Sequence, residues 1–413
     1  QQIKVVIAHD NRNNSNTLAQ LVADVFSANG IYVYFFDGLR PTPELSYAIR
    51  ELDCKSGVML TASHNPKEYN GYKAYGHDGG QLTTPHDESV MDEVRAVKSI
   101  EEVKFEGNPA LIEKIGEEID KKYLDAIAGE SISKEAIARQ SDIKIVFSPI
   151  HGTGGVLVPP LLDRMGFKNV ILVEEQMVVD GNFPTVIYPN PEEAEALSMA
   201  IAKAKETGAD LVMATDPDAG AIMTKLQGQK TFVVGGEESY GYLVGEHARD
   251  KDAVVACGMI AEMAAFYKDN GSSLYEALMN TYVEHGLYKE SLISLTKKGK
   301  SGAEEIQAML ASFRKSPPSS FAGSKVVTVK DYKSGISTDI ASGEVSKIDL
   351  PSSNVLQFFT EDGSIISARP SGTEPKIKFY CSVNAPVDSR DKIAEATSVL
   401  DKKIELIRKD LGV

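Results

Sequence analysis

The chain has 413 residues, 59 of them acidic and 44 basic, so its formal net charge at pH 7 is −15. A chain of this length is too long for one hydrophobic core and predicts about three or four domains, while the acidic excess argues against a nucleic-acid partner. The three cysteines are far apart and lack metal-ligand spacing, and no apolar run approaches the roughly 20 residues that span a bilayer. We therefore expect a cytoplasmic protein with no membrane partner and no disulfide framework.

The first part of the chain has the pattern of a layered α/β domain. Residues 3–8 and 31–36 are apolar runs, and the amphipathic segment 17–29 lies between them. This order predicts a strand, a helix and a second strand, which form a βαβ unit. A further apolar run at residues 57–60 predicts a strand that ends in a sharp polar turn.

That turn, residues 61–66 with the sequence TASHNP, contains the first candidate for covalent chemistry. It presents Ser63 beside His64 at the edge of a sheet, where a substrate can reach the hydroxyl. A serine is a weak nucleophile unless a base, a lowered pKa or a metal activates it, and a Ser-His pair in a turn is more often a capping motif. The catalytic interpretation therefore depends on partners elsewhere in the chain.

A second βαβ pattern begins near the middle of the chain. Residues 144–147 predict a strand, residues 151–155 a glycine-rich turn followed by a helix, and residues 169–173 another strand. The glycine spacing does not match the dinucleotide-binding fingerprint, and no acidic partner for a ribose is evident. His151 either contacts a substrate phosphate or caps the turn, and the sequence leaves both open.

Two carboxylates follow the next predicted strand, residues 209–214. Asp216 and Asp218 stand two residues apart in a turn. Carboxylate oxygens are ligands that Mg²⁺ accepts in ones and twos while phosphate oxygens fill other positions. The alternative is an ordinary Asp-Pro turn.

The last part of the chain predicts a smaller α+β domain, with strands near residues 355–359 and 376–382 and a helix over residues 388–411. The turn between these strands carries a guanidinium, two hydroxyls and an exposed backbone around one glycine, with an amine just beyond. Such groups suit a dianionic phosphate, whereas the alternative is a basic, solvated turn. The residues concerned are Arg369, Ser371, Gly372, Thr373 and Lys378.

Four motifs in this order resemble those of the α-D-phosphohexomutases, the phosphoglucomutase and phosphomannomutase superfamily. They are TASHNP at 61–66, DPD at 216–218, GGEESYG at 235–241 and RPSGTEP at 369–375. The resemblance covers nearly the whole chain. It implies a multidomain α/β protein with repeated βαβ-type mixed-sheet domains around a central cleft and a smaller α+β C-terminal domain. The expected domains are a phosphoserine domain at 1–125, a metal-loop domain at 126–224, a sugar-loop domain at 225–316 and a phosphate-binding domain at 317–413.

The resemblance also implies a role for each matching residue. Ser63 becomes the phosphoserine and binds a metal together with Asp216 and Asp218. Lys73 steadies the transferred group or shuttles a proton, while His64 either shapes the turn or acts in acid/base catalysis. The sugar hydroxyls are contacted by Glu237 and Ser239, and the phosphate is bound by Arg369, Ser371, Gly372, Thr373 and Lys378. The implied cofactors are Mg²⁺ and a glucose 1,6-bisphosphate primer.

The activity implied is that of a phosphoglucomutase, which interconverts glucose 1-phosphate and glucose 6-phosphate through a bisphosphate intermediate. The GGEESYG motif resembles the glucose-preferring members, whereas the HGTG and RDKDA motifs at 151–154 and 249–253 resemble a branch that also contains phosphopentomutases. A phosphomannomutase or phosphopentomutase therefore remains an alternative. A phosphoserine hydrolase and a catalytically silent sugar-phosphate-binding relative are alternatives from other classes.

The sequence departs from the family pattern in three places. The metal loop usually has a third aspartate followed by an arginine, whereas Asp218 is followed here by Ala219 and Gly220. Only about ten residues connect Lys225 to Gly235, too few for the βα segment that the family has there. The arginine-bearing loop that usually precedes the first strand is absent. Two ligands alone would leave a weak metal site, and the first and third domains look incomplete. Whether these segments are truly absent stays open, and catalysis is in doubt if they are.

Overall fold

The computed structural model describes residues 2–222, 233–236, 240–297, 299–350, 352–371 and 376–412. The chain forms two compact units, residues 1–272 and residues 273–413, and each is described below by itself. Within the described ranges, no helix combines the length and the apolar character needed to cross a membrane.

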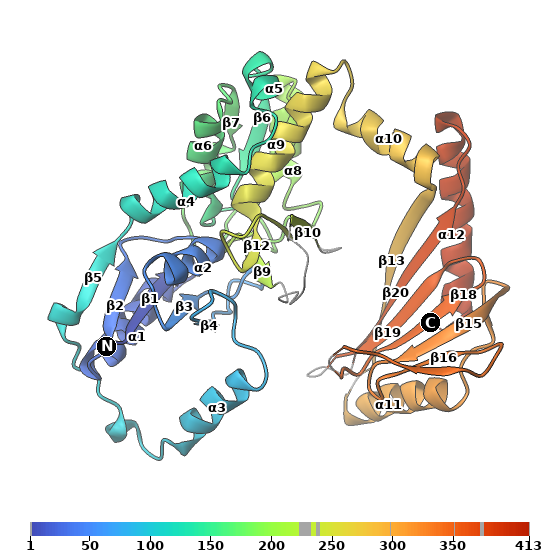
Figure 1. Cartoon of the computed structure of the whole chain (residues 1–413), viewed down its shortest axis with the longest axis horizontal. Helices are drawn as coiled ribbons and strands as arrows, with labels where there is room; N and C mark the ends of the chain where they lie inside the picture. The colour runs from blue at the N-terminus through green and yellow to red at the C-terminus, as the bar shows by residue number, and fades with distance from the viewer. Residues whose placement is uncertain are drawn as a thin grey trace. The chain divides into compact units, whose positions relative to one another are not determined.

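The first unit begins with a mixed five-stranded sheet in the order β4-β3-β1-β2-β5. Strands β1, β2, β3 and β5 are parallel to one another, and β4 runs antiparallel to β3 at the edge (Figure 1). The predicted βαβ unit over residues 3–36 is thus confirmed. The strands are β1 (Lys4–His9), β2 (Tyr32–Phe36), β3 (Ser56–Leu60), β4 (Tyr72–Gly76) and β5 (Ile112–Ile115).

Helices cover both faces of this sheet because alternate residues of its strands point to opposite sides. Val5 and Ile7 of β1 pack in one apolar cluster with residues of α1 (Ser15–Ala28). Val6 and Ala8 belong to a second cluster, which includes residues of α2 (Thr42–Glu51) and α4 (Glu117–Gly129). The result is the layered architecture that the sequence pattern predicts.

The next sheet of the first unit has three parallel strands in the order β7-β6-β8. The strands are β6 (Ile145–Ser148), β7 (Val170–Leu172) and β8 (Leu211–Ala214). Its connections contain α6 (Gly154–Met165), α7 (Glu174–Met177) and α8 (Ser198–Thr207), and α5 (Lys134–Arg139) precedes β6. The second predicted βαβ unit is thus also confirmed.

The described residues between 219 and 272 form two small antiparallel ladders and a long helix. In one ladder β9 (Gly220–Ile222) pairs with β12 (Asp250–Asp252), and in the other β10 (Val234–Gly236) pairs with β11 (Tyr242–Val244). The helix α9 (Ala253–Asp269) packs against α5 and α6. No larger sheet forms among the described residues of this stretch.

The segment after β4 is more exposed than the rest of the unit. It contains α3 (His86–Ala96) and two 3₁₀ turns, Ile100–Glu102 and Pro109–Leu111. No residue of α3 is buried, and Figure 1 shows the helix away from the sheet that precedes it.

The second unit is an antiparallel sheet in the order β13-β20-β19-β18-β15-β16-β17, with a short strand β14 paired to β15. Its apolar core includes side chains of α11 and α12, and Figure 1 shows α12 lying along the sheet. The α+β character expected of the C-terminal part is confirmed, and the sheet and core include residues on both sides of position 317. The elements are α10 (Leu274–His285), β13 (Leu287–Thr296), α11 (Gly299–Lys315), β14 (Ser320–Phe321), β15 (Ser324–Asp331), β16 (Ile336–Asp339), β17 (Val345–Lys347), β18 (Leu356–Thr360), β19 (Ile365–Pro370), β20 (Lys376–Ala385), a 3₁₀ turn (Arg390–Lys392) and α12 (Ile393–Asp410).

Candidate active site

The candidate site of the first unit lies where four loops leave the carboxyl ends of parallel strands. These loops follow β1, β3, β6 and β8 and comprise residues 10–14, 61–65, 149–153 and 215–219. Ligands of open α/β sheets bind in the crevice outside the carboxyl ends of their strands. The fold therefore brings together segments that are up to about two hundred residues apart in the sequence.

The hydroxyl of Ser63 lies against both carboxylates of the predicted metal loop. Its Oγ is 2.9 Å from Oδ2 of Asp216 and 3.0 Å from Oδ1 of Asp218. A hydroxyl has one proton and can donate fully to only one of them at a time. Three oxygen atoms therefore meet with too few protons to form a hydrogen bond between each pair. This arrangement is expected of a cation-binding site.

The turn that carries Ser63 is held in an uncommon backbone conformation. Ser63 has a φ of 52°, in the left-handed region that non-glycine residues rarely adopt, and such a conformation costs on the order of 1–3 kcal/mol. The Ser63 amide donates to Oγ1 of Thr61 at 2.9 Å, and the Thr61 amide donates to the carbonyl of Gly71 at 3.1 Å. These bonds stabilise a turn that aims the hydroxyl at the carboxylates.

Arg12, in the loop after β1, binds the same turn from the other side. Its guanidinium donates to the backbone carbonyls of three residues of the turn, Ser63 at 2.6 Å, Asn65 at 2.5 Å and Pro66 at 2.9 Å, and to that of Tyr69 just after it at 3.0 Å. Asp10 lies 3.5 Å from Nε of Arg12, and both side chains are fully buried. Burial raises the pKa of Asp10 to about 6 despite hydrogen bonds from Thr61, Arg12 and Ser15.

Asp218 is the more completely enclosed of the two carboxylates. Its Oδ2 accepts from Nζ of Lys73 at 2.8 Å and from the hydroxyl of Thr42 at 3.1 Å. Burial alone would raise the pKa of Asp218, but the charge and hydrogen bond of Lys73 outweigh it and lower that pKa. The pKa of Asp216 is raised by burial and by the negative charge of Asp218. Lys73 therefore acts here as the cation that keeps Asp218 ionised.

His64 lies at the rim of the site. Its Nδ1 is 3.9 Å from Oδ2 of Asp216, and its side chain is 52% exposed. The hydrogen bond and charge of Asp216 raise the pKa of His64. Since the imidazole faces the carboxylate, the arrangement favours a charge partner of Asp216 over a residue that shapes the turn.

The donor set fits a magnesium ion. Ser63, Asp216 and Asp218 supply hard oxygen atoms, and Mg²⁺ is commonly held by one or two carboxylates together with substrate phosphates and water. Among the residues that the structure describes, no group of three His, Cys, Asp or Glu side chains could hold a metal. Any ion bound here therefore depends on the serine oxygen, or on a phosphate attached to it, to complete its ligands.

The loop after β6 supports the metal loop from behind. Thr153 donates its amide and its hydroxyl to the carbonyl oxygen of Pro217, and a Cβ placed on Gly152 would lie 2.5 Å from Cα of Pro217. His151 is 1% exposed, and its ring nitrogens contact the carbonyl of Val178 at 2.7 Å and the hydroxyl of Thr185 at 2.8 Å. Both ring nitrogens thus bond to residues of another loop, which is a structural role different from the turn cap that the sequence suggested as one alternative.

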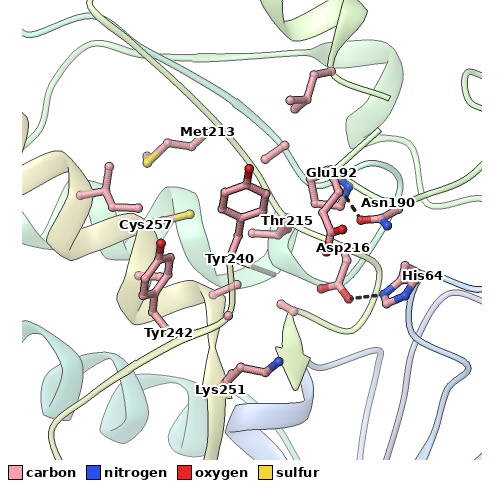
Figure 2. Close-up of a pocket in the computed structure, with 18 of the residues that line it drawn as sticks. His64, Asn190, Glu192, Met213, Thr215, Asp216, Tyr240, Tyr242, Lys251 and Cys257 are labelled. Atoms are coloured by element: carbon pink, nitrogen blue, oxygen red, sulfur yellow. Dashed lines mark hydrogen bonds and ion pairs between the residues drawn. The ribbon is translucent and has the colours of Figure 1, made fainter. Parts of the chain in front are cut away.

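A cavity of about 610 Å³ opens beside the serine and Asp216. Figure 2 shows Tyr240, Tyr242 and Cys257 along one side of it, whereas His64 and Asp216 gather on the other. Much of the remaining wall is apolar and comes from β8 and α9. Lys251 also lines this cavity and is only 6% exposed; a Cβ on Gly241 would lie 2.0 Å from its Cδ.

The predicted phosphate residues lie in the second unit, at one end of the β19–β20 hairpin. Arg369 and Lys378 are directly paired across the two strands, so their side chains lie on the same face. Ser371 follows β19, and its amide donates to the carbonyl of Lys376 at 2.8 Å. Two neighbouring cations repel each other, and an anion bound between them would relieve this repulsion. The predicted residues Gly372, Thr373, Glu237 and Ser239 lie outside the described residues.

Sequence reasoning missed three residues that the structure places at the site: Arg12, Thr153 and Lys251. A signal existed for Arg12, because a polar DNR sequence follows the first predicted strand at the same sheet edge as the serine turn. Thr153 lies in the glycine-rich turn at 151–155 and Lys251 in the RDKDA motif at 249–253, and neither pattern indicates what these two side chains contact.

Comparison with known families decides what kind of protein this is. Models of the phosphoglucomutase/phosphomannomutase α/β/α domains I, II and III match residues 1–101, 121–225 and 219–282. The chain belongs to the phosphoglucomutase/phosphomannomutase family. The resemblance read from its motifs is thus confirmed.

Curated relatives agree with this assignment. A phosphoglucomutase of Staphylococcus haemolyticus is 32% identical over an alignment of 464 residues, which covers 95% of this chain and 84% of that protein. A phosphoglucomutase of Staphylococcus aureus is 32% identical over 458 residues and is covered to 82%. Both alignments are longer than the 413 residues of this chain, so each relative has residues without a counterpart here.

Solved structures show the same fold. A phosphoglucomutase from Paramecium, pp63/parafusin in an open form, matches with a TM-score of 0.71 at 17% identity and covers 100% of this chain and 89% of its own. A phosphoglucomutase/phosphomannomutase family protein from Burkholderia thailandensis gives a TM-score of 0.64 at 19% identity, with 99% and 89% of the two chains covered.

Proposed function

We propose that this protein is a phosphoglucomutase, an isomerase that interconverts glucose 1-phosphate and glucose 6-phosphate. The proposal is supported by family membership, by relatives named phosphoglucomutase over most of the chain, and by the GGEESYG motif at 235–241. The observation that carries the chemistry is the contact of the Ser63 hydroxyl with Asp216 and Asp218. A fully buried carboxylate and a partly exposed one beside a partly exposed serine suit a phosphoserine and its counter-ion.

In the proposed reaction, phosphorylated Ser63 transfers its phosphoryl group to a free hydroxyl of the bound sugar phosphate. The bond between phosphorus and the serine oxygen breaks, a phosphate ester forms on the sugar, and the proton that the sugar hydroxyl loses replaces the phosphoryl group on the serine oxygen, so the product is glucose 1,6-bisphosphate. After this intermediate turns around, its other phosphoryl group passes to Ser63. In that step the serine proton has acceptors within 3.0 Å, the carboxylates of Asp216 and Asp218.

Positioning and charge neutralisation carry most of the rate in phosphoryl transfer, and the chain supplies groups for both. A magnesium ion held by Ser63, Asp216 and Asp218 would neutralise negative charge on the transferred phosphoryl group. Arg12 fixes the serine turn, and Lys73 balances Asp218. Glu237 and Ser239 would orient the sugar, and the distal phosphate would be bound by Arg369, Ser371, Gly372, Thr373 and Lys378.

A coupled assay tests the proposal directly. We expect conversion of glucose 1-phosphate to glucose 6-phosphate in the presence of Mg²⁺ and a glucose 1,6-bisphosphate primer. The Ser63→Ala variant should show none, because it has no atom to accept the phosphoryl group. Intact-mass analysis should find one phosphoryl group on the primed wild type and none on the variant.

The same assay separates the alternatives. Mannose 1-phosphate or ribose 1-phosphate converted faster than glucose 1-phosphate would favour a phosphomannomutase or a phosphopentomutase. Release of inorganic phosphate in place of isomerisation would indicate a hydrolase. No conversion of any of these sugar phosphates, with no phosphoryl group on Ser63, would favour a silent sugar-phosphate-binding protein.

We further propose a cytoplasmic location, where sugar phosphates are metabolised and thiols stay reduced. Cys54, Cys257 and Cys381 are all free and buried, in keeping with a reducing compartment. Fractionation of the source cells, followed by the mutase assay on each fraction, tests this location.

A further inference from the structure

The loop at residues 178–185 packs against the loop that carries Arg12, although the two belong to different sheets of the first unit. The side chain of Asn11 donates to the carbonyl of Asp180 at 3.1 Å, and that of Asn13 donates to Oδ1 of Asn182 at 3.1 Å. A Cβ on Gly181 would lie only 2.6 Å from the backbone nitrogen of Asn13. The backbones of the two loops are therefore closely packed.

Phe183 is the apolar centre of this contact. It is 2% exposed, and its ring contacts two side chains from loops that follow strands of different sheets. The guanidinium carbon of Arg12 is 5.4 Å from the ring centroid, within the range of a cation–π interaction. The ring of His151 meets it edge-on with centroids 6.4 Å apart.

The backbone of Phe183 is strained in a way that these contacts must offset. Its φ is 48°, a conformation that is uncommon for a bulky side chain and costs on the order of 1–3 kcal/mol. The residue keeps this conformation only because its surroundings fix it. Its amide donates to the carbonyl of Asp180 at 3.2 Å, its carbonyl accepts from the Val186 amide at 3.1 Å, and its ring packs against Arg12 and His151.

Both neighbours of the ring act on the reacting groups. Arg12 binds the carbonyls of the turn that presents Ser63. His151 precedes Gly152 and Thr153, which hold the loop of Asp216 and Asp218 through Pro217. Phe183 thus links Arg12, which holds the serine turn, to His151, which precedes the residues that hold the metal loop. This link does not include Ser63 or the two carboxylates.

We infer that Phe183 is a positioning residue of the phosphoryl-transfer site, fixing the serine turn relative to the metal loop through Arg12 and His151. This inference rests on the proposed function only for its catalytic consequence. The geometric link exists in the protein without substrate or metal and can be measured there.

The test compares Phe183→Leu with Phe167→Leu, a matched change of a phenylalanine that is also 2% exposed but contacts neither loop in the described interactions. Hydrogen–deuterium exchange is followed in peptides covering residues 61–70 and 149–156. We expect Phe183→Leu to accelerate exchange in both peptides, and Phe167→Leu to leave them as in the wild type. Unchanged exchange in the 61–70 peptide, with faster exchange only near residue 183, would overturn the inference.

Kinetics provide the second readout. Because misplacement by a fraction of an ångström affects the transfer step more than substrate binding, kcat should fall about tenfold with KM within a factor of about two. In the Arg12→Lys background, Phe183→Leu should lower kcat little further, since both changes loosen the same serine turn. Full additivity of the two changes would contradict the inference. If the wild type lacks mutase activity but its exchange responds as expected, the proposed function fails and the positioning link stands.

Discussion

Thr153 donates both its backbone N–H and its hydroxyl to the carbonyl oxygen of Pro217, at 2.9 and 2.8 Å. Pro217 is the residue between the two carboxylates that contact Ser63. A residue of the second βαβ unit thus holds the metal loop through the backbone of that loop.

Replacing Thr153 by valine should therefore weaken catalysis more than folding. The change keeps the shape of the side chain and removes one of the two bonds, which costs about 1 kcal/mol of stability. We expect kcat to fall several-fold and the Mg²⁺ concentration for half-maximal activity to rise. Thr153→Ser keeps the hydroxyl and should retain both values, and a valine variant equal to wild type would show that the bond has no positioning role.

Gly152 offers a test by steric conflict in the same place. A Cβ there would lie 2.5 Å from Cα and 2.8 Å from the carbonyl oxygen of Pro217, and backbone atoms cannot move aside without shifting the metal loop. Gly152→Ala should reduce kcat by one to two orders of magnitude. Gly129→Ala is the matched control, because a Cβ at that position would meet no atom within 4 Å apart from its chain neighbours and the backbone of its own helix. Equal effects of the two substitutions on kcat would count against this explanation.

The sequence was sufficient to predict much of the fold because the strands and helices of both βαβ units carry their own periodic patterns. Ser63, Asp216 and Asp218 could be predicted because each follows an apolar strand in a polar turn. Their meeting could not be derived from those local patterns, since it depends on how two sheets pack within the unit.

Arg12 and Phe183 illustrate what local patterns do not reveal. Arg12 binds backbone carbonyls about fifty residues away. Since every residue has a carbonyl group, no sequence motif indicates which ones an arginine binds. Phe183 is one of several apolar residues in its loop, and its importance comes from the two side chains that its ring contacts, Arg12 and His151. Such roles become visible only when the loops are assembled in three dimensions.

The Arg12→Lys variant should show how much kcat depends on the hydrogen bonds that hold the serine turn. A lysine keeps the charge but cannot bind several carbonyls through a planar fork, so most of the four hydrogen bonds are lost. We expect a loss in kcat of about a hundredfold and slower phosphorylation of Ser63 by the primer, followed by intact mass. Arg139→Lys, at a surface ion pair with Asp269, should leave both unchanged.

Lys73 and Asp218 should behave as a buried ion pair. The bond between them is 2.8 Å long and the Asp218 side chain is fully buried, so removal of the lysine alone leaves an uncompensated charge. Lys73→Met should destabilise the first unit by about 3–5 kcal/mol, measured by urea unfolding. The double variant Lys73→Met with Asp218→Asn should recover a large part of this loss, and no recovery would mean that the charge of Asp218 is not the cause.

Asp362 should make the second unit sensitive to acid. Its carboxylate accepts from Lys403 at 2.6 Å, from the Thr360 hydroxyl at 2.7 Å and from the Ser364 hydroxyl at 2.9 Å. Burial alone would raise the pKa of Asp362, but these hydrogen bonds outweigh it and lower the pKa below its ordinary value.

A folded-state pKa below that of the unfolded chain means that the unfolded chain binds the proton more readily. The stabilisation is then complete above the ordinary aspartate pKa of about 4 and is lost as the pH falls below it. We expect protection from hydrogen exchange in the β18–β19 turn to decline from pH 5 to pH 3, after correction for intrinsic rates. Asp362→Asn should abolish this decline while reducing protection at pH 7. Asp349→Asn, at an exposed ion pair with Lys347, should leave the profile of the wild type intact.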